Sequence, residues 1–178
     1  MSINSQKETL WALCFGDDIS VAREFFTISD IVTLTTTENG ELVAMASLVP
    51  VSTDNGLLGL YVYGVCTHPD HRGRGHFRTL MERCESIALA EKKDFLCLIP
   101  ANYTVALTYR RMGYTIDVSL CKDKKDTDTK ISSMSKEFSE YAIPNEECLS
   151  FDHGLLKPLS EKMTNGQSFS FLKHMGEC

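Results

Sequence analysis

The spacing of apolar and polar residues predicts an alternation of helices and strands along most of the chain. Apolar residues recur every three or four positions, as in amphipathic helices, over residues 6–16, 18–28, 77–88, 104–112 and 155–163. Alternating or continuous apolar segments typical of strands cover residues 31–38, 41–51, 57–67, 95–99, 114–121 and 168–172. The pattern therefore predicts a mixed fold in which helices and strands both contribute to the core.

Several details of the pattern sharpen this prediction. Asn39-Gly40 separates two alternating segments and is the strongest short signal for a β-hairpin. Residues 95–99 are apolar throughout, as expected of a strand buried inside a sheet. Residues 122–130 alternate in charge without apolar residues and are expected to form a solvated loop. We expect a core over residues 1–122, a loop over 123–145, and a helix and strand over 146–178 that complete the domain or form a small extension.

The segment from 65 to 77 carries most of the functional information. A predicted strand over 57–67 leads into a turn with Gly73 and Gly75, and the turn opens directly onto the helix 77–88. Backbone N–H groups and the positive end of the helix dipole meet at such a point, which favours binding of phosphate. The turn is basic in a chain of net charge −6, and its cations are Arg72, Arg74 and Arg78. We interpret it as a cradle for a pyrophosphate, with an ordinary strand-to-helix connection as the alternative.

Two motifs resemble those of the GNAT superfamily of acyl-CoA-dependent N-acetyltransferases. The first is similar to the family's Arg/Gln-x-x-Gly-x-Gly/Ala motif, with Arg72, Gly75 and Phe77 in the defining positions and Pro69 before them. The second resembles the family's Asn-x6-Tyr-x3-Gly-aromatic segment, through Asn102, Tyr109, Gly113 and Tyr114. Residues 10–17 also resemble the opening helix of a bacterial-type branch. The resemblance covers residues 8 to 120.

The chain departs from the family pattern in two places. Phe77 stands where the family usually has Gly or Ala, and it belongs to an apolar stripe formed by Phe77, Leu80, Met81, Cys84, Ile87 and Ala88. We expect Phe77 to turn inward, which leaves the pose of the pyrophosphate open. The chain is also predicted to begin in a helix, so the family's usual first strand is not expected.

The resemblance implies a fold and a cofactor. The expected fold class is α/β (mixed α+β), with a central mixed, mostly antiparallel twisted sheet that is flanked by helices and splayed at the cofactor site. Acetyl-CoA would be the co-substrate. The residues implied in binding it are Val65, Cys66, Thr67, Arg72, Gly73, Arg74, Gly75, His76, Phe77, Arg78 and Asn102. Arg110 or Arg111 could reach a further phosphate, although solvated surface positions are the favoured explanation of both.

The implied reaction is direct transfer of an acetyl group to a primary amine of a small molecule or peptide. Tyr109 matches the family's tyrosine acid, which protonates the departing CoA thiolate; a packing role on the inner helix face is the alternative. The amine must lose a proton before attack, but the strand face with Tyr61 and Tyr63 carries no carboxylate. Glu41, Asp54, His76 or a water chain could serve, and the sequence assigns no base. His68 and His71 are expected to be surface residues.

Composition narrows the remaining classes of function. Hydrophobic residues make up 43% and charged residues 24% of the 178 residues, as in ordinary globular proteins. No apolar segment is long enough to span a membrane, and the acidic balance argues against nucleic acid. The cysteine count is seven, an odd number, and no Cys-x-x-Cys pair occurs. We therefore expect a reduced, cytoplasmic protein without a metal; homodimerisation stays open.

Three other functions are the alternatives to acetyl transfer. A non-catalytic acyl-CoA sensor on the same fold is favoured by the missing strand carboxylate. An ATP-binding protein is disfavoured because the Gly-x4-Gly-Lys-Ser/Thr motif is absent. An interaction module in the C-terminal 55 residues has no positive signal. The expected function is an acetyl-CoA-dependent N-acetyltransferase.

Overall fold

The structure is a computed structural model that describes residues 2–53, 56–119, 153–162 and 172–174. Its contacts divide the chain into two compact units, residues 1–49 with 62–87, and residues 50–61 with 88–178. Strands β2 (Glu41–Thr53) and β3 (Leu58–Thr67) and helix α3 (His76–Ala90) each contribute to both units. The predicted loop over 123–145 lies outside the described residues.

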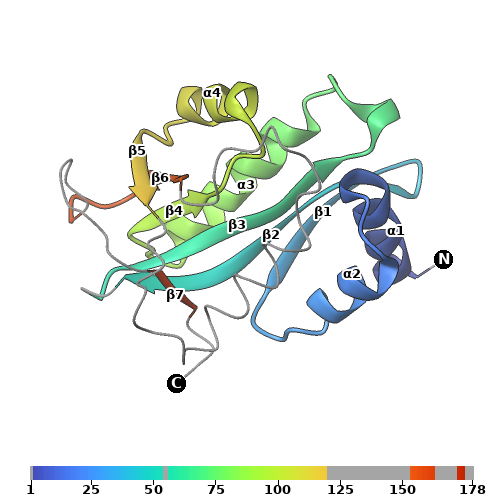
Figure 1. Ribbon diagram of the computed structural model, residues 1–178, viewed down its shortest axis with the longest axis horizontal. Coiled ribbons are helices and arrows are strands. Elements are labelled where there is room, and N and C mark those ends of the chain that lie inside the picture. Colours follow the sequence, from blue (N-terminus) through green and yellow to red (C-terminus); the bar gives the residue numbers. More distant parts are fainter. Residues whose placement is uncertain (1, 54–55, 120–152, 163–171, 175–178) are drawn as a thin grey trace. The chain divides into compact units, whose positions relative to one another are not determined.

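The first unit opens with two helices, α1 (Ile3–Phe15) and α2 (Ile19–Phe25), which pack against each other (Figure 1). Helix α1 ends at Gly16, whose φ of 78° is left-handed, and α2 begins after Asp18, whose carboxylate accepts the N–H of Ser20. The break predicted near residues 16–17 is therefore confirmed, and each helix has a local reason to stop or start there.

The predicted hairpin is also confirmed. Strand β1 (Val32–Glu38) pairs antiparallel with β2, and Glu38 lies opposite Glu41 across a two-residue turn. Asn39 and Gly40 both have positive φ, at 51° and 83°, as a tight hairpin turn requires. The unit continues through the later residues of β3, the short 3-10 helix η1 (Pro69–His71) and the start of α3.

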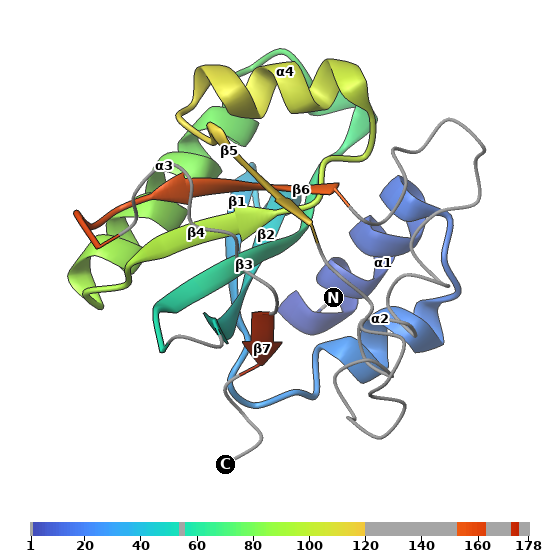
Figure 2. The ribbon, with the colours of Figure 1, turned by 60° about the vertical axis from the view of Figure 1, so that its left-hand side comes forward.

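The second unit contains the strands that follow α3. It comprises β4 (Phe95–Leu98), α4 (Tyr103–Arg111), β5 (Ile116–Ser119), β6 (His153–Pro158) and β7 (Leu172–His174). The strand order is β3-β4-β6-β5, with β4 parallel to β3 and β6 antiparallel to both of its neighbours (Figure 2). Strand β7 pairs antiparallel with the end of β2. All residues of β4 are buried, as the sequence predicted.

The predicted helix over 155–163 is wrong. The structure has strand β6 there, followed by a turn at residues 161–162, and Leu155 and Leu156 are 3% and 0% exposed between β4 and β5. The spacing of the leucines fits a helix, but Pro158 would sit in its interior and remove a backbone hydrogen bond. At the end of β6 the same proline is tolerated. The predicted strand over 168–172 overlaps β7 only at Leu172, because residues 163–171 lie outside the described residues.

The expected fold class is confirmed as mixed α/β, with a mostly antiparallel sheet flanked by helices. Pairs β1–β2, β2–β7, β4–β6 and β5–β6 are antiparallel, and β3–β4 is parallel. Each helix within the described ranges is too short or too polar to span a bilayer.

Candidate functional site

The strand–turn–helix segment of the first unit has the geometry that the sequence predicted. Strand β3 ends at Thr67, η1 follows, and α3 begins at His76, one residue after Gly75. The N–H of His68 donates to the carbonyl of Val43 at 2.8 Å, so the loop starts from a point held by β2. We call residues 72–76 the cradle loop. The N–H groups of the first turn of α3 point out of the helix end toward this loop.

Glycine is required at two positions of the cradle loop. Gly73 and Gly75 have φ values of 76° and 87°, a left-handed region that other residues rarely adopt. A Cβ built on either glycine would meet no heavy atom within 4 Å. Both glycines are exposed, as are Arg72, Arg74 and Arg78. The loop therefore offers open backbone surrounded by positive charge.

The end of β3 is tied to the loop and to α1. The Nε of Arg72 donates to the carbonyl of Thr67 at 3.2 Å, and the thiol of Cys14 contacts the same oxygen at 3.7 Å. A hydrogen bond from the Cys66 thiol, together with the positive charge of Arg72, lowers the pKa of Cys14. The pKa of Cys66 is raised by the same pairing and by burial. Cys66 is buried, whereas the neighbouring Val65 and Thr67 are half-buried.

The predicted apolar stripe anchors α3. Leu80, Met81, Cys84 and Ala88 are buried, at no more than 2% exposed. Phe77 and Ile87 are half-buried, so Phe77 turns only partly inward. Burial raises the pKa of Cys84 to about 12, which makes it an unreactive apolar group. The stripe anchors α3 in the core and so fixes the helix start that follows the cradle loop.

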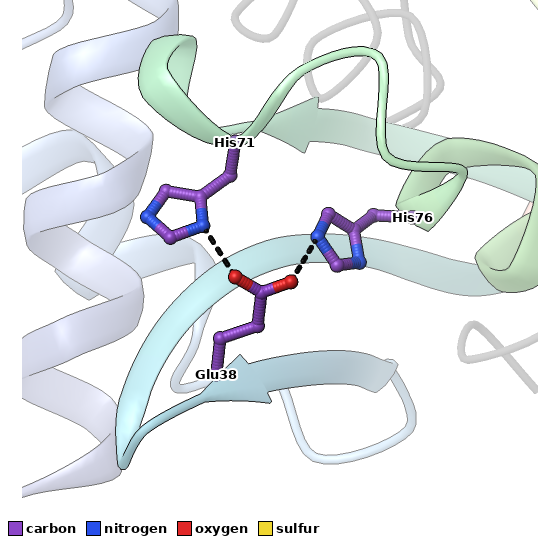
Figure 3. A group of neighbouring side chains, drawn as sticks. All are labelled: Glu38, His71 and His76. Carbon is purple, nitrogen blue, oxygen red and sulfur yellow. Dashed lines mark hydrogen bonds and ion pairs between the residues drawn. The ribbon is translucent and has the colours of Figure 1, made fainter.

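The structure brings together three residues that the sequence did not connect (Figure 3). Glu38, at the end of β1, accepts a hydrogen bond from the ring of His71, with Oε2 2.8 Å from Nδ1. Its Oε1 lies 2.9 Å from Nε2 of His76, and Arg74 Nη1 donates to Oε2 at 3.0 Å. The hydrogen bond from His71, with the charges of Arg74 and His76, lowers the pKa of Glu38. His71, expected at the surface, has a side chain only 21% exposed.

Asn102 and Tyr109 belong to the second unit. Asn102 is the N-cap of α4, where its Oδ1 accepts the N–H of Val105 at 2.9 Å; the preference of helix starts for Asn could have indicated this role. Tyr109 is 5% exposed, and its ring meets that of Tyr114 edge-on with centroids 5.6 Å apart. Tyr109 therefore packs in the core, an arrangement that fits both a packing role and a proton donor with its hydroxyl inside the protein.

The strand face without a carboxylate includes Tyr63, which packs against the rings of Trp11 and Phe25. Burial and the charge of Asp17 raise the pKa of Tyr63, which keeps it protonated and a poor base. The candidate bases lie elsewhere. Glu41 is exposed at the hairpin, and Asp54 lies outside the described residues. His76 is held beside Glu38.

Comparison with known proteins decides the family. The sequence model of the acetyltransferase (GNAT) domain matches residues 6–116, which is more than half of the chain. The chain belongs to the GNAT family. The family supports an acyl-CoA-dependent acetyltransferase activity in general terms. A search of the curated proteins gives no significant match.

Solved GNAT structures share the fold at low sequence identity. A GNAT family N-acetyltransferase (YhbS) from Escherichia coli, solved in complex with CoA, is 12% identical with a TM-score of 0.66, over 98% of this chain and 86% of that chain. The ribosomal-protein-S18-alanine N-acetyltransferase from Escherichia coli is 12% identical with a TM-score of 0.58, over 95% and 96%. A ribosomal-protein-alanine N-acetyltransferase from Brucella melitensis is 19% identical with a TM-score of 0.54, over 61% and 83%. At these identities the similarity establishes the fold of this GNAT protein.

Proposed function

We propose that this GNAT protein transfers the acetyl group of acetyl-CoA to a primary amine of a small molecule or peptide. The cradle loop is the observation that carries the proposal. Gly73 and Gly75 leave backbone open at the start of α3, and exposed arginines surround it. Backbone N–H groups, a helix dipole and guanidinium groups together favour a ligand with the charge of a pyrophosphate. Membership of the GNAT family supports CoA as the source of that pyrophosphate.

The pantetheine arm would pair with the later residues of β3. The register of β3 with β4 joins residues 59–61 to residues 95–97, and β3 continues beyond it to Thr67. Val65, Cys66 and Thr67 would offer backbone groups to the arm, which resembles a peptide strand. The side chain of Arg72 donates to the Thr67 carbonyl and is exposed, and it would turn toward a phosphate when CoA binds. Asn102 would contact the cofactor through its amide while its oxygen caps α4.

The chemical step is attack of the amine nitrogen on the thioester carbonyl carbon. The carbon–sulfur bond of the tetrahedral intermediate then breaks, and the thiolate takes a proton from the hydroxyl of Tyr109. The proton of the amine leaves to a base that we do not assign. Because an amine of pKa ~10.4 is almost fully protonated at pH 7, this second proton transfer needs help from the acceptor's surroundings.

A reduced, cytosolic location forms part of the proposal. Among the described cysteines, Cys14, Cys66, Cys84 and Cys97 are free thiols. Free thiols persist where glutathione and thioredoxin keep proteins reduced.

Calorimetry with CoA and acetyl-CoA tests the binding step. We expect saturable heat for both ligands, followed by acetylated product, detected by mass spectrometry, from at least one member of a panel of primary amines. No heat from either ligand would overturn the proposal. Binding without product across the panel would instead favour a non-catalytic acyl-CoA sensor. The strand face that bears Tyr61 and Tyr63 carries no carboxylate, which also favours a sensor.

A further inference from the structure

We propose that Glu38, His71 and His76 form a binding site for a divalent transition-metal ion of the zinc class. Glu38 is the last residue of β1, His71 the last of η1 and His76 the first of α3. Figure 3 shows both imidazole rings turned toward the carboxylate from these separate elements. An ion held there would join the β1–β2 hairpin to η1 before the cradle loop and to the start of α3 after it.

The donor atoms have the chemistry that such ions prefer. Imidazole nitrogen suits zinc, copper, nickel and iron, and two histidines with one glutamate are a known zinc ligand set that leaves a coordination position open. The ligands are partly enclosed, with side chains 30%, 21% and 12% exposed for Glu38, His71 and His76. An ion could therefore enter from solvent and still be shielded once bound.

The spacing of the donor atoms is close to what one ion requires. One ring nitrogen of His71, one ring nitrogen of His76 and an oxygen of Glu38 lie within 4.8 Å of one another. Two atoms that are each about 2.1 Å from the same ion can be at most about 4.2 Å apart. Rotations of side chains that move these atoms by less than about an ångström would bring all three within coordination distance. The backbone of the three elements need not move.

A buried nitrogen gives a second, independent indication. Nε2 of His76 is buried and has no hydrogen-bond partner among the described residues. It lies 2.9 Å from Oε1 of Glu38, but the direction of this contact does not make a hydrogen bond. A buried polar atom left in this state is costly, and a metal ion between the two side chains would satisfy it.

Arg74 is the natural competitor of the ion. Its guanidinium donates to the same oxygen of Glu38 that accepts from His71, and also to the carbonyl of Asp70. The side chain is 53% exposed, so it can turn into solvent when a cation arrives. Binding of the ion to the carboxylate of Glu38 would thus displace the guanidinium of Arg74.

This proposal departs from our expectation that the protein has no metal. That expectation came from the cysteine pattern, and the present site contains no cysteine. The proposal also does not depend on CoA, because every group in it belongs to the protein and the test uses zinc alone.

The test is titration of the full chain with Zn(II) after treatment with EDTA. We expect one equivalent to bind, with nitrogen and oxygen ligands at about 2.0–2.1 Å by zinc K-edge X-ray absorption. Sulfur ligands at about 2.3 Å would place the ion on cysteines and overturn the proposal, as would the absence of saturable binding.

Matched variants assign the ligands. Glu38→Gln and His76→Gln are each expected to weaken Zn(II) binding about tenfold or more. Glu41→Gln, which alters the carboxylate opposite Glu38 in the hairpin, and His68→Gln are expected to bind as the native chain does. Arg74→Gln is expected to bind Zn(II) more tightly. Unchanged affinity in Glu38→Gln and His76→Gln, with circular dichroism showing that both are folded, would overturn the assignment.

Discussion

Trp11 lies directly over Gly64: a Cβ built on this glycine of β3 would be 2.7 Å from Cζ3 of the indole ring. The φ of Gly64 is 59°, so β3 leaves regular strand geometry three residues before its end. The same indole packs against Phe15, Phe25, Phe26 and Tyr63, and its Nε1 donates to Asp17 at 2.6 Å. The irregular residue of β3 is therefore held by the aromatic cluster of the first unit.

Gly64→Ala should destabilise the protein through both effects. The left-handed conformation costs about 1–2 kcal/mol for an alanine, and the clash with Trp11 adds about 1–3 kcal/mol of overpacking. The free energy of unfolding, measured with urea, should fall by the sum. Gly16→Ala is the matched control, because its φ is 78° and its Cβ would meet nothing within 4 Å. If both variants lose the same free energy of unfolding, the indole of Trp11 moves aside without cost and the clash contributes nothing.

Gly75→Val should weaken CoA binding without unfolding the protein. The new side chain would fill the open space beside the cradle loop, where we place the pyrophosphate. Calorimetry should show the dissociation constant for CoA rising by about tenfold or more, since displaced charge-assisted hydrogen bonds contribute about 1.5–3 kcal/mol each. Gly56→Val, at another open position with a φ of 82°, should leave the affinity for CoA unchanged.

Tyr109→Phe should separate catalysis from packing. The phenyl ring retains the contact with Tyr114, whereas the proton donor is lost. We expect turnover to fall by about 10²-fold or more, with the affinity for acetyl-CoA nearly intact. Tyr114→Phe, which removes the neighbouring hydroxyl, should retain turnover. If both variants keep native turnover, Tyr109 serves only the core.

Cys14 should be the most reactive of the described thiols. Its pKa is lowered by the Cys66 thiol and by Arg72, whereas the pKa values of Cys66, Cys84 and Cys97 are raised. Because the thiolate is the nucleophile, iodoacetamide near neutral pH should modify Cys14 first among these residues, as read by peptide mass spectrometry. Cys66→Ala removes the hydrogen bond to the thiolate, so the pH profile of alkylation should move to higher pH. Cys84→Ala should not shift it.

Asp94→Asn should lower stability at neutral pH and reduce its loss in acid. Burial alone would raise the pKa of Asp94, but hydrogen bonds from Leu58 N and Ser160 and the ion pair with Lys162 lower it overall. A carboxyl whose pKa is lowered by folding stabilises the protein above its unfolded pKa, and this contribution disappears as the pH falls through its folded pKa.

We therefore expect the unfolding free energy of Asp94→Asn to be about 1–3 kcal/mol below the native value at pH 7. The difference should shrink below pH ~4, as urea unfolding at several pH values would show. Glu161→Gln alters an exposed carboxylate in the turn after β6, and its unfolding free energy should match that of the native protein at every pH. A difference for Asp94→Asn that is independent of pH would contradict the role of its charge.

The hairpin turn and helix α3 could be predicted because short stretches of sequence determine their conformation. Asn39-Gly40 adopts the positive φ values of a tight turn whatever surrounds it, and the apolar stripe of α3 needs only a core to face. The sequence does not predict strand β6, because Leu155 and Leu156 are buried by long-range pairing with β4 and β5. Pro158 is a local signal against a helix there, but it does not indicate which strands lie alongside.

The candidate site divides in the same way. The strand–turn–helix order alone indicates that Gly73 and Gly75 form an open turn, because the left-handed φ values of this turn favour glycine. Glu38 lies 33 residues before its hydrogen-bond partner His71, and only the fold of the first unit brings the two together. The sequence signal for this cluster is a pair of histidines flanking the glycine-rich turn together with a carboxylate next to the Asn-Gly hairpin turn.

The place of β6 between β4 and β5 has a consequence for synthesis of the chain. When β5 leaves the ribosome, the strand that must lie beside it and beside the wholly apolar β4 has not yet emerged. Until then the edge of β4 in the nascent second unit is unpaired and apolar, and such an edge favours chaperone binding or aggregation. Folding of this unit is a late, long-range event, completed only when residues 153–158 close the sheet.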